Sequence, residues 1–309
     1  MYNYMLSRAL DSIKIRNNKK HDENQYLSLI DDIINHGDIV EGRNGKALTV
    51  FGSSMHFSLN NGEMPLLTTK KVAWKTCLKE LLWFISGSTN NDLLNKQNVK
   101  IWNGNSSREF LDGRGLVNNR ENDLGPVYGH QWRFFNADYT TCDDNYKGKG
   151  IDQLEYIIKQ LKDPKERYSR RLIMSAWNPC QIDEMALPPC HVLVQFNVLP
   201  DNKLSCSLYQ RSGDVGLGVP FNIASYSFLT HLIAKHCDLV AYEFCYYLGN
   251  CHIYDDHIEQ LKKQSNNEPY NFPKLSIKTK KDNINDYNLD DFELINYECH
   301  EINKMTMRN

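Results

Sequence analysis

The sequence predicts a single α+β (α/β) domain in which amphipathic helices pack on a β-sheet. Apolar residues recur at helical spacing in several segments, and at least four other segments are rich in apolar, β-branched and aromatic residues. No internal repeat, linker or clear domain boundary interrupts the 309 residues. A chain of this length buries a sizeable core without disulfide or metal support.

Helices are predicted where apolar spacing ends at a glycine or proline. The predicted helices and their stop residues are Tyr26–His36 with Gly37, Trp74–Ile85 with Gly87, and Ile151–Leu161 with Pro164. A fourth helix, Phe221–His236, follows Pro220, a residue that suits a first helical turn.

The predicted strands are Arg171–Trp177, His191–Val198, Lys203–Tyr209 and Glu243–Leu248. Several of them are apolar on both faces, which indicates that helices or another subunit cover the sheet on both sides. The stretch 105–123, rich in Gly, Asn and Arg, is expected to form a surface insertion.

One antiparallel hairpin has a predictable register. The strands 191–198 and 203–209 flank Leu-Pro-Asp-Asn at 199–202, a turn signal. If Asp201 and Asn202 form the loop, residues whose numbers sum to about 403 lie opposite each other. Cys190 is then expected beside Arg211 and Ser212.

Composition excludes several classes of protein. A net charge of −2 and a pI near 6.6 argue against a protein whose whole surface holds nucleic acid. The apolar runs are too short to span a membrane, and residues 1–24 form a polar, basic extension, expected to be flexible, without the apolar segment of a signal peptide. Nine cysteines, none of them in a C-x-x-C pair, favour a reducing compartment and argue against a metal site. The expected location is the cytoplasm, and the nucleus is not excluded.

Cys190 is the strongest candidate nucleophile. A nearby guanidinium stabilises a thiolate, and the hairpin brings Arg211 close. The prolines at 188 and 189 keep the thiol at a strand edge. An inert, buried cysteine is the competing interpretation, and the register leaves the two about equally favoured.

Arginines and a glycine-rich loop suggest an anion site. The candidate arginines are Arg43, Arg170, Arg171 and Arg211. If their guanidinium groups converge in the fold, they would bind a phosphate; the alternative is that they lie apart on the surface. The loop 213–222 leads from a strand into a helix, where Asn222 either reads a base edge or caps the helix.

Glu80 lies among apolar residues of the second helix. It is either a carboxyl group of raised pKa that relays protons or part of a solvated face. Tyr128, His252 and Tyr254 are further candidates.

Three segments of the chain resemble those of a known enzyme family. Leu-Pro-Pro-Cys-His at 187–191, Leu-Tyr-Gln-Arg-Ser-Gly-Asp at 208–214 and Pro-Phe-Asn-Ile-Ala-Ser-Tyr at 220–226 closely resemble the signature segments of the thymidylate synthases. Further motifs follow in the family's order, so the resemblance covers residues 25–309 as a single domain. The segment 107–112 is similar to the eukaryotic and large-DNA-virus form.

The resemblance implies a large mixed sheet, covered by helices on one face and packed on the partner subunit's sheet on the other. It implies a homodimer with shared active sites that converts dUMP and 5,10-methylenetetrahydrofolate to dTMP and dihydrofolate, without metal or NAD(P). Cys190 would add to C6 of the uracil. Glu80 would organise water and protons, and Tyr128 and Asn222 would orient the pyrimidine and its C5 proton.

The resemblance also assigns residues. The catalytic set would be Cys190, Glu80, Tyr128, Arg211, Asp214 and Asn222. The dUMP site would add Arg43, Gln210, Ser212, Gly213, His252 and Tyr254, with Arg170 and Arg171 from the partner chain. The folate site would comprise Ile101, Trp102, Asn105, Leu187, Asp214, Leu217, Gly218, Phe221 and Arg308.

Three departures from the family pattern stand out. The phosphate loop that begins at Arg43 is one residue shorter than usual, Asn250 stands where an aspartate is common, and the tail 304–309 is polar rather than apolar. The tail of the family closes over the folate, and exclusion of water protects the reactive intermediate.

Two alternatives to a thymidylate synthase are a pyrimidine deoxynucleotide hydroxymethylase and a non-catalytic nucleotide- or RNA-binding relative. Asn222 suits uracil rather than cytosine, and Trp102 favours hydride transfer over hydroxylation. Joint retention of Cys190, Glu80, Arg211 and Asn222 argues against loss of catalysis. The acidic net charge gives no indication of RNA binding.

Overall fold

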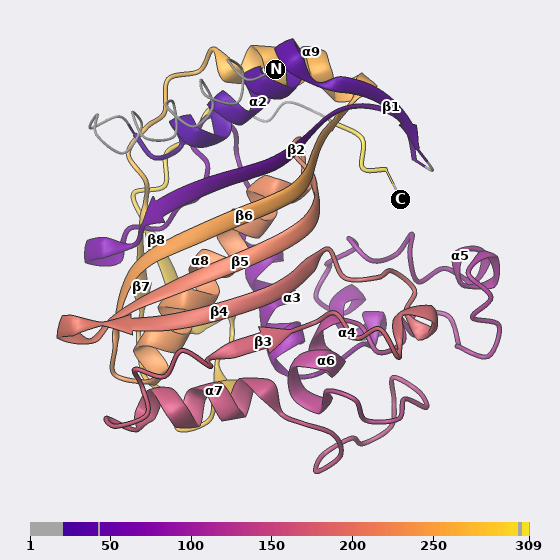
Figure 1. The fold of residues 1–309 in the computed structure, drawn as a ribbon, viewed down its shortest axis with the longest axis vertical. Coiled ribbons are helices and arrows are strands. Elements are labelled where there is room, and N and C mark those ends of the chain that lie inside the picture. The colour runs from indigo at the N-terminus through magenta and orange to yellow at the C-terminus, as the bar shows by residue number, and fades with distance from the viewer. Residues whose placement is uncertain (1–20, 43, 302–304, 309) are drawn as a thin grey trace.

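The protein, represented by a computed structural model, is described for residues 21–42, 44–301 and 305–308. A six-stranded sheet has the order β1-β2-β6-β5-β4-β3 (Figure 1). Its strands are β1 (Asp38–Gly42), β2 (Gly45–Ser58), β3 (Ile173–Ser175), β4 (His191–Leu199), β5 (Lys203–Asp214) and β6 (Val240–Tyr254). Strands β5 and β6 are parallel and the other neighbours are antiparallel, so the predicted mixed sheet is confirmed.

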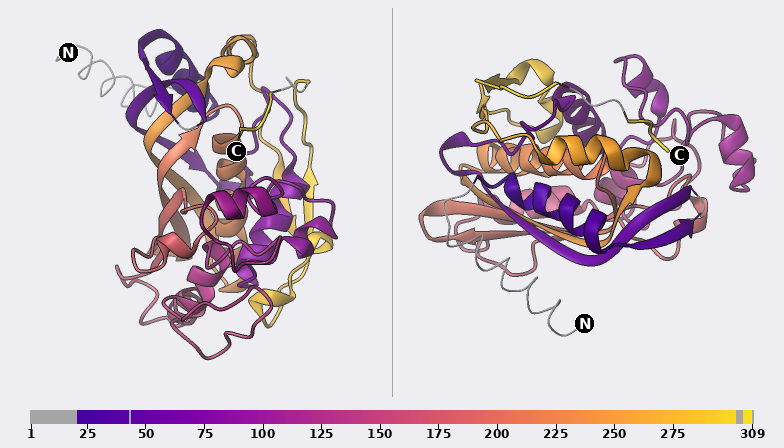
Figure 2. Two further views of the ribbon diagram at one scale, coloured as in Figure 1. Left: turned by 90° about the vertical axis from the view of Figure 1, so that its right-hand side faces the viewer. Right: turned by 90° about the horizontal axis from the view of Figure 1, so that it is seen from above.

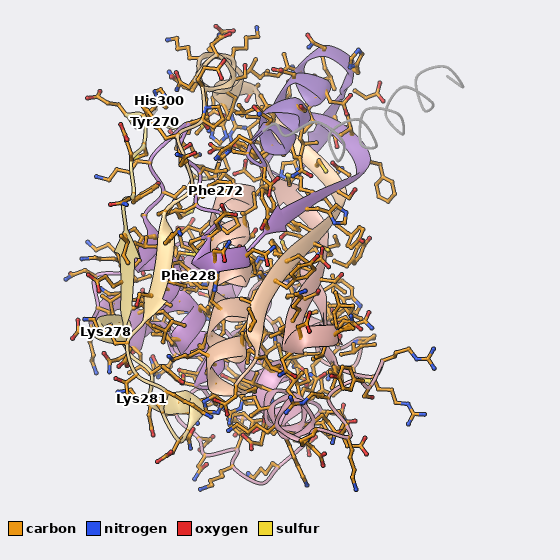
Figure 3. All side chains as sticks on the ribbon, turned by 90° about the vertical axis from the view of Figure 1, so that its left-hand side faces the viewer. Phe228, Tyr270, Phe272, Lys278, Lys281 and His300 are labelled. Atoms are coloured by element: carbon orange, nitrogen blue, oxygen red, sulfur yellow. The ribbon has the colours of Figure 1, made fainter. Side chains whose placement is uncertain are left out.

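Helix α8 (Gly218–His236) forms the centre of the core. It lies behind the sheet in Figure 1 and is buried around almost its whole circumference. The small ribbon of β7 (Lys274–Ile277) and β8 (Phe292–Ile295) lies on the opposite side of α8 from the sheet (Figure 2, left; Figure 3). Phe228 of α8 meets Phe292 edge to face at 6.3 Å, so α8 is packed between two β layers.

The other helices surround this core. They are α2 (Asn24–His36), α3 (Trp74–Ile85), α4 (Asn91–Asn95), α5 (Arg108–Gly113), α6 (Tyr128–Phe134), α7 (Gln153–Lys162) and α9 (Ile258–Ser265). The first two predicted helices are confirmed. The third begins two residues later than predicted, because the Asp152 carboxylate accepts from the backbone N–H of Glu155 and caps the helix there.

Several other boundaries differ from the prediction, including that of β5, which extends to Asp214 rather than Tyr209. Helix α8 begins at Gly218, three residues before the predicted start at Phe221, so Asn222 lies inside the second turn. Strand β3 keeps only residues 173–175, whereas β6 extends well beyond the predicted 243–248. The segment 105–123 is not wholly a surface insertion, since Asn105, Ser106 and Asp123 are buried.

The β4–β5 hairpin brings Cys190 next to Arg211, as predicted, but its loop length and strand register differ from the prediction. Its loop has three residues, Pro200–Asn202, and Asp201 and Asn202 adopt φ of 64° and 57°. Paired residues therefore have numbers that sum to 402, and an irregularity between His191 and Leu193 reduces the sum to 401. The N–H of Arg211 then donates to the carbonyl of Cys190 at 3.0 Å.

Within the described part of this chain, no helix covers the outer face of the sheet (Figure 1). Side chains alternate along β4 and β5, with one set buried against α8 and the other half-buried or exposed. Tyr209 and Tyr247 on this face remain 41% and 42% exposed. The described residues of a single chain therefore cover one face of the sheet, and a partner sheet on the other face is proposed below.

The N-terminal part of the described chain is packed tightly. Glu23 is fully buried, and its carboxylate accepts hydrogen bonds from the backbone and hydroxyl groups of Thr68 and Thr69. Residues 1–20 of the predicted extension lie outside the described residues. Within the described part, no helix combines the length and apolar character needed to cross a bilayer.

Candidate active site

A cleft of about 610 Å³ opens where α3, the ends of β4, β5 and β6, the start of α8 and the C-terminal tail meet. It is lined by Asn44, Glu80, Phe84, Ile101, Trp102, Asn105, Tyr128, Leu187, Cys190, His191, Gln210, Arg211, Ser212, Asp214, Leu217, Gly218, Phe221, Asn222, His252, Tyr254, Met307 and Arg308. Most of the residues predicted from the sequence therefore share one cavity.

Cys190 directly precedes the first residue of β4 and is held by contacts on two sides. Its backbone N–H donates to the phenol oxygen of Tyr128 at 2.8 Å, and its Sγ lies 3.8 Å from Nη2 of Arg211. The guanidinium is fixed in turn, because it donates to the carbonyls of Pro188 and Pro189 at 2.9 Å each. A cation held at this distance stabilises a thiolate, the reactive form of cysteine.

His191 follows Cys190 and also lines the cleft, but it is no partner for a thiolate–imidazolium pair. Burial lowers the pKa of His191 to about 4, and a hydrogen bond with the side chain of Asn222 only partly offsets this. At neutral pH the ring is uncharged. Asn222 is thus oriented by a neutral ring, with its amide at the cleft surface.

Glu80 of α3 is 6% exposed and points into the cleft rather than to solvent. Burial raises the pKa of Glu80 to about 7, although Nε1–H of Trp102 donates to its Oε1 at 2.7 Å and lowers the pKa in part. A carboxyl group with this pKa exchanges protons readily near neutral pH. Glu80 therefore does not belong to a solvated face of the helix.

The amide of Gln210 is oriented on both sides. Tyr246 donates to its Oε1 at 2.6 Å, and its Nε2 donates to the carbonyl of Ser212 at 2.8 Å. Gly213 does not line the cleft, and its role is packing. A Cβ there would come within 2.9 Å of the side chains of both Leu248 and Val219.

Asp214 shapes the loop between β5 and α8. Its Oδ1 accepts from the N–H of Gly216 at 2.9 Å and lies 3.8 Å from Nδ1 of His257. A Cβ on Gly216 would approach that imidazole to 2.7 Å, so glycine is required. Lys70 donates to the carbonyl of Gly216, and burial lowers the pKa of Lys70 to about 8 while Asp214 opposes the shift.

His252 has a defined tautomer. The amide of Asn250 donates to Oγ1 of Thr49 at 2.6 Å, which directs its oxygen toward Nδ1 of His252 at 2.9 Å. Nδ1 therefore carries the proton and donates to that oxygen. Burial also lowers the pKa of His252. The neutral ring leaves Nε2 as an acceptor for a ligand hydroxyl, and the amide at position 250 can perform the orienting role of an aspartate.

One wall of the cleft is apolar. Ile101, Leu187 and Phe221 are partly buried against the core, and Trp102 meets the ring of Tyr128 edge to face at 6.0 Å. A flat, apolar wall beside polar groups suits a stacked heteroaromatic ligand. Leu217, Gly218 and Asn105 complete the surface at the loop and at the entrance to the insertion.

The polar tail is held over the cleft entrance. Arg308 donates to Asp255 at 2.5 Å, to Asp256 at 2.8 Å and to the carbonyl of Asn44 at 3.0 Å. Its guanidinium also lies 5.0 Å from the ring centre of Tyr254. Arg308 thus makes two ion pairs near the end of the polar tail.

The structure does not bring every predicted residue into the cleft. Arg170 and Arg171 are exposed and lie outside it, and Arg43 lies outside the described residues. Four lining residues have no role predicted from the sequence: Asn44, Phe84, His191 and Met307. All four are adjacent or close in sequence to predicted residues, which is the signal that could have revealed them.

The sequence of this chain matches a known protein family. The family model for thymidylate synthase matches residues 24–309. The chain belongs to the thymidylate synthase family. It is 50% identical over 299 residues to the thymidylate synthase of Saccharomyces cerevisiae (strain ATCC 204508 / S288c), covering 94% of this chain and 98% of that protein.

Other similar proteins in the thymidylate synthase family are longer. The chain is 52% identical over 302 residues to the bifunctional dihydrofolate reductase-thymidylate synthase of Plasmodium berghei (strain Anka), covering 97% of this chain and 50% of that protein. It is 50% identical over 292 residues to the bifunctional protein of Leishmania major, covering 94% and 56% respectively. The chain spans about half the length of these bifunctional relatives.

Proposed function

We propose that this chain catalyses the reductive methylation of dUMP to dTMP, with 5,10-methylenetetrahydrofolate as the co-substrate and dihydrofolate as the second product. The observation that carries the proposal is Cys190, whose thiol lies 3.8 Å from the fixed guanidinium of Arg211 in a cleft that also contains Glu80. Family membership supports the same reaction.

The residues of the cleft suit the steps of that reaction. The Cys190 thiolate forms a bond to C6 of the uracil, and the electrons of the C5–C6 double bond move toward C5 and O4. The amide of Asn222 and the phenol of Tyr128 orient the ring and its C5 proton. Glu80, with its pKa of about 7, relays protons through water when that C5 proton leaves.

The folate supplies both the one-carbon unit and the hydride that completes the methyl group, so it ends as dihydrofolate and no nicotinamide or metal is needed. Expulsion of the Cys190 sulfur restores the double bond and frees dTMP. In this proposal Ile101, Trp102, Leu187 and Phe221 hold the folate ring. Asp214 hydrogen-bonds to the folate ring.

The dUMP site would use both charged and neutral groups. Arg211 and Ser212 bind the phosphate together with Arg43, and His252 and Tyr254 hold the ribose hydroxyl. Nε2 of His252 is available as the acceptor in that contact, because Nδ1 donates to Asn250. Gln210 is held rigidly enough to orient the nucleotide.

We further propose a homodimer with shared sites. The outer face of the sheet bears half-buried and exposed aromatic side chains, and pairing two such faces would bury them. Arg170 and Arg171 are exposed in this chain and would contribute to the phosphate site of the partner. None of the nine cysteines, all of which are among the described residues, forms a disulfide, which supports our proposal that the enzyme works in the cytoplasm.

The experiment that tests the reaction incubates the protein with dUMP and methylenetetrahydrofolate. We expect dihydrofolate and dTMP in equal amounts, with Cys190→Ser inactive but still able to bind dUMP. Hydroxymethyl-dUMP without dihydrofolate would identify a hydroxymethylase instead. Nucleotide binding without turnover in the unaltered protein would identify a non-catalytic relative.

Mixing two inactive variants tests the shared site. A chain carrying Arg170→Glu and Arg171→Glu keeps its own Cys190, whereas a Cys190→Ala chain keeps its arginines. Hybrid dimers formed from the two should recover part of the activity. Absence of rescue, with hybrid formation demonstrated by mass, would contradict a site built from two chains.

A further inference from the structure

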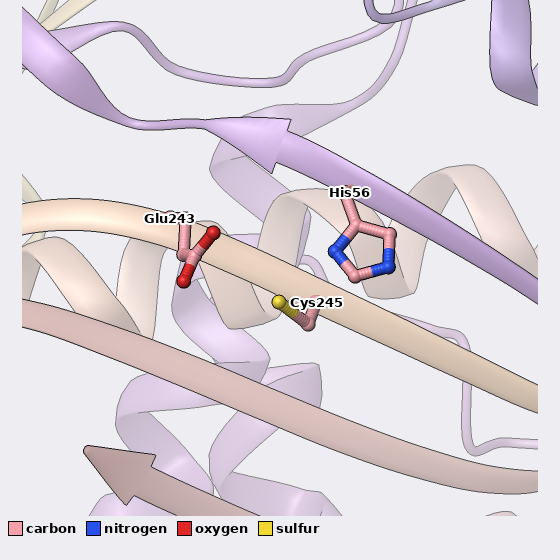
Figure 4. A group of neighbouring side chains, drawn as sticks. All are labelled: His56, Glu243 and Cys245. Carbon is pink, nitrogen blue, oxygen red and sulfur yellow. The ribbon is translucent and has the colours of Figure 1, made fainter. Parts of the chain in front are cut away.

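A second group of reactive side chains lies on the outer face of the sheet, apart from the cleft. Among the described residues, His56 of β2 and Glu243 and Cys245 of β6 have ligand atoms that all lie within 4.8 Å of one another (Figure 4). Figure 4 shows the three side chains on the same side of the sheet, with the helices behind it. None of them lines the cleft.

The strand register explains why these residues converge. His56 and Cys245 are directly paired across the antiparallel β2–β6 ladder. Glu243 precedes Cys245 by two residues, so its side chain lies on the same face of the strand. The three positions are rigid parts of long strands rather than loop residues, which limits the movement needed to bring the ligand atoms together.

The donor set is that of a borderline transition metal. It offers an imidazole nitrogen, a carboxylate oxygen and a thiolate sulfur. Metal–ligand bonds of about 2.0 to 2.3 Å in a tetrahedral site place the ligand atoms roughly 3.3 to 3.8 Å apart. The observed separations of up to 4.8 Å therefore close with small side-chain rotations.

Neighbouring groups already hold the side chain of one ligand and the backbone of another. Oγ of Ser205 donates to Oε1 of Glu243 at 3.0 Å. The side chain of Gln25 clamps the backbone of His56, since it accepts from the N–H at 2.9 Å and donates to the carbonyl at 2.6 Å. Such outer contacts are typical of sites in which the metal-binding side chains are held in place.

We propose that His56, Glu243 and Cys245 bind one divalent transition-metal ion of the Zn²⁺ class, with a water molecule as the fourth ligand. The ion would link β2 to β6 within the face of the sheet that we propose packs against a second chain. The site is structural and does not depend on the reaction proposed above. No sequence pattern indicates this site, because its ligands are almost 190 positions apart and lack C-x-x-C spacing.

Cobalt is the probe for this site, since Co²⁺ substitutes for Zn²⁺ and its bond to a thiolate absorbs in the near ultraviolet. The experiment uses full-length Cys190→Ser protein, stripped of metal by a chelator, so that the cleft thiol cannot contribute. We expect one equivalent of Co²⁺ to produce the thiolate band and visible bands of a four-coordinate ion. Zn²⁺ should displace it.

Variants then assign the band. Cys245→Ser should abolish it, whereas the matched control Cys180→Ser removes an exposed cysteine outside the cluster and should leave it unchanged. Ser205→Ala, which preserves every ligand, should weaken Co²⁺ binding by about tenfold. No thiolate band in the parent protein, or a band that survives Cys245→Ser in folded protein, would overturn the proposal.

Discussion

Replacing Glu80 by Gln should stabilise the folded protein at every pH above that at which free carboxyl groups ionise. Below that pH it should have no effect on stability. Burial raises the pKa of Glu80 from 4.5 to about 7. Between these values the unfolded chain loses the proton that the folded chain keeps, so the stability of the native state falls as pH rises through this window. The loss is about 1.4 kcal/mol per pH unit, or about 3 kcal/mol in all.

The Glu80→Gln variant would lack this penalty while preserving shape, and the oxygen of the new amide can still accept from Trp102. The free energy of unfolding, measured in urea at fixed protein concentration, should match the parent near pH 4.5. At pH 8 the variant should exceed the parent by about 3 kcal/mol, although activity falls. A difference that does not change between these pH values, or a variant that is less stable at pH 8, would refute the assigned burial and pKa.

Three further predictions concern neighbouring groups. Trp102→Phe removes the donor to the Glu80 carboxylate and should raise its pKa by about one to two units, seen as a shifted limb in the pH profile of kcat/KM; an unshifted limb would contradict the contact. Asn250→Asp places a carboxylate against Nδ1 of His252 and should raise the pKa of that ring by about one to two units, measured by NMR titration, with KM for dUMP changing more than kcat. Arg308→Ala should raise KM for the folate about fivefold, because it removes the ion pairs with Asp255 and Asp256, while dUMP binding stays unchanged. The conservative variant Arg308→Lys keeps the charge but not the planar fork and should therefore lose less affinity than the alanine variant.

The sequence predicted features that depend on local pattern or on one hairpin. Helices α2 and α3 follow from apolar spacing and a glycine stop, and the turn at residues 199–202 was sufficient to pair Cys190 with Arg211. The register was off by one because Asp201 and Asn202 both adopt left-handed backbone conformations in a three-residue loop. A three-residue loop and a two-residue loop differ in their backbone angles, and the residue pattern at 199–202 does not specify those angles.

Features that depend on tertiary contacts were beyond sequence reasoning. The pKa of Glu80 is raised because folding buries the carboxyl group, and Trp102, 22 residues away, donates to it only in the folded chain. The tautomer of His252 depends on Thr49 through Asn250, and these residues meet because β2 pairs with β6. The same pairing creates the cluster of His56 and Cys245. Residue patterns therefore indicated which residues line the cleft, whereas burial and tertiary contacts determine their pKa values and hydrogen bonds.

The most direct test of the central claim follows the hydride. The enzyme is supplied with dUMP and methylenetetrahydrofolate that carries deuterium at C6 of the folate, and the nucleotide product is analysed by mass spectrometry. The proposed reaction predicts dTMP with a single deuterium in its methyl group, formed in step with dihydrofolate and absent with Cys190→Ser. Unlabelled dTMP, or a hydroxymethyl nucleotide, would contradict the claim that this cleft transfers both carbon and hydride from one folate.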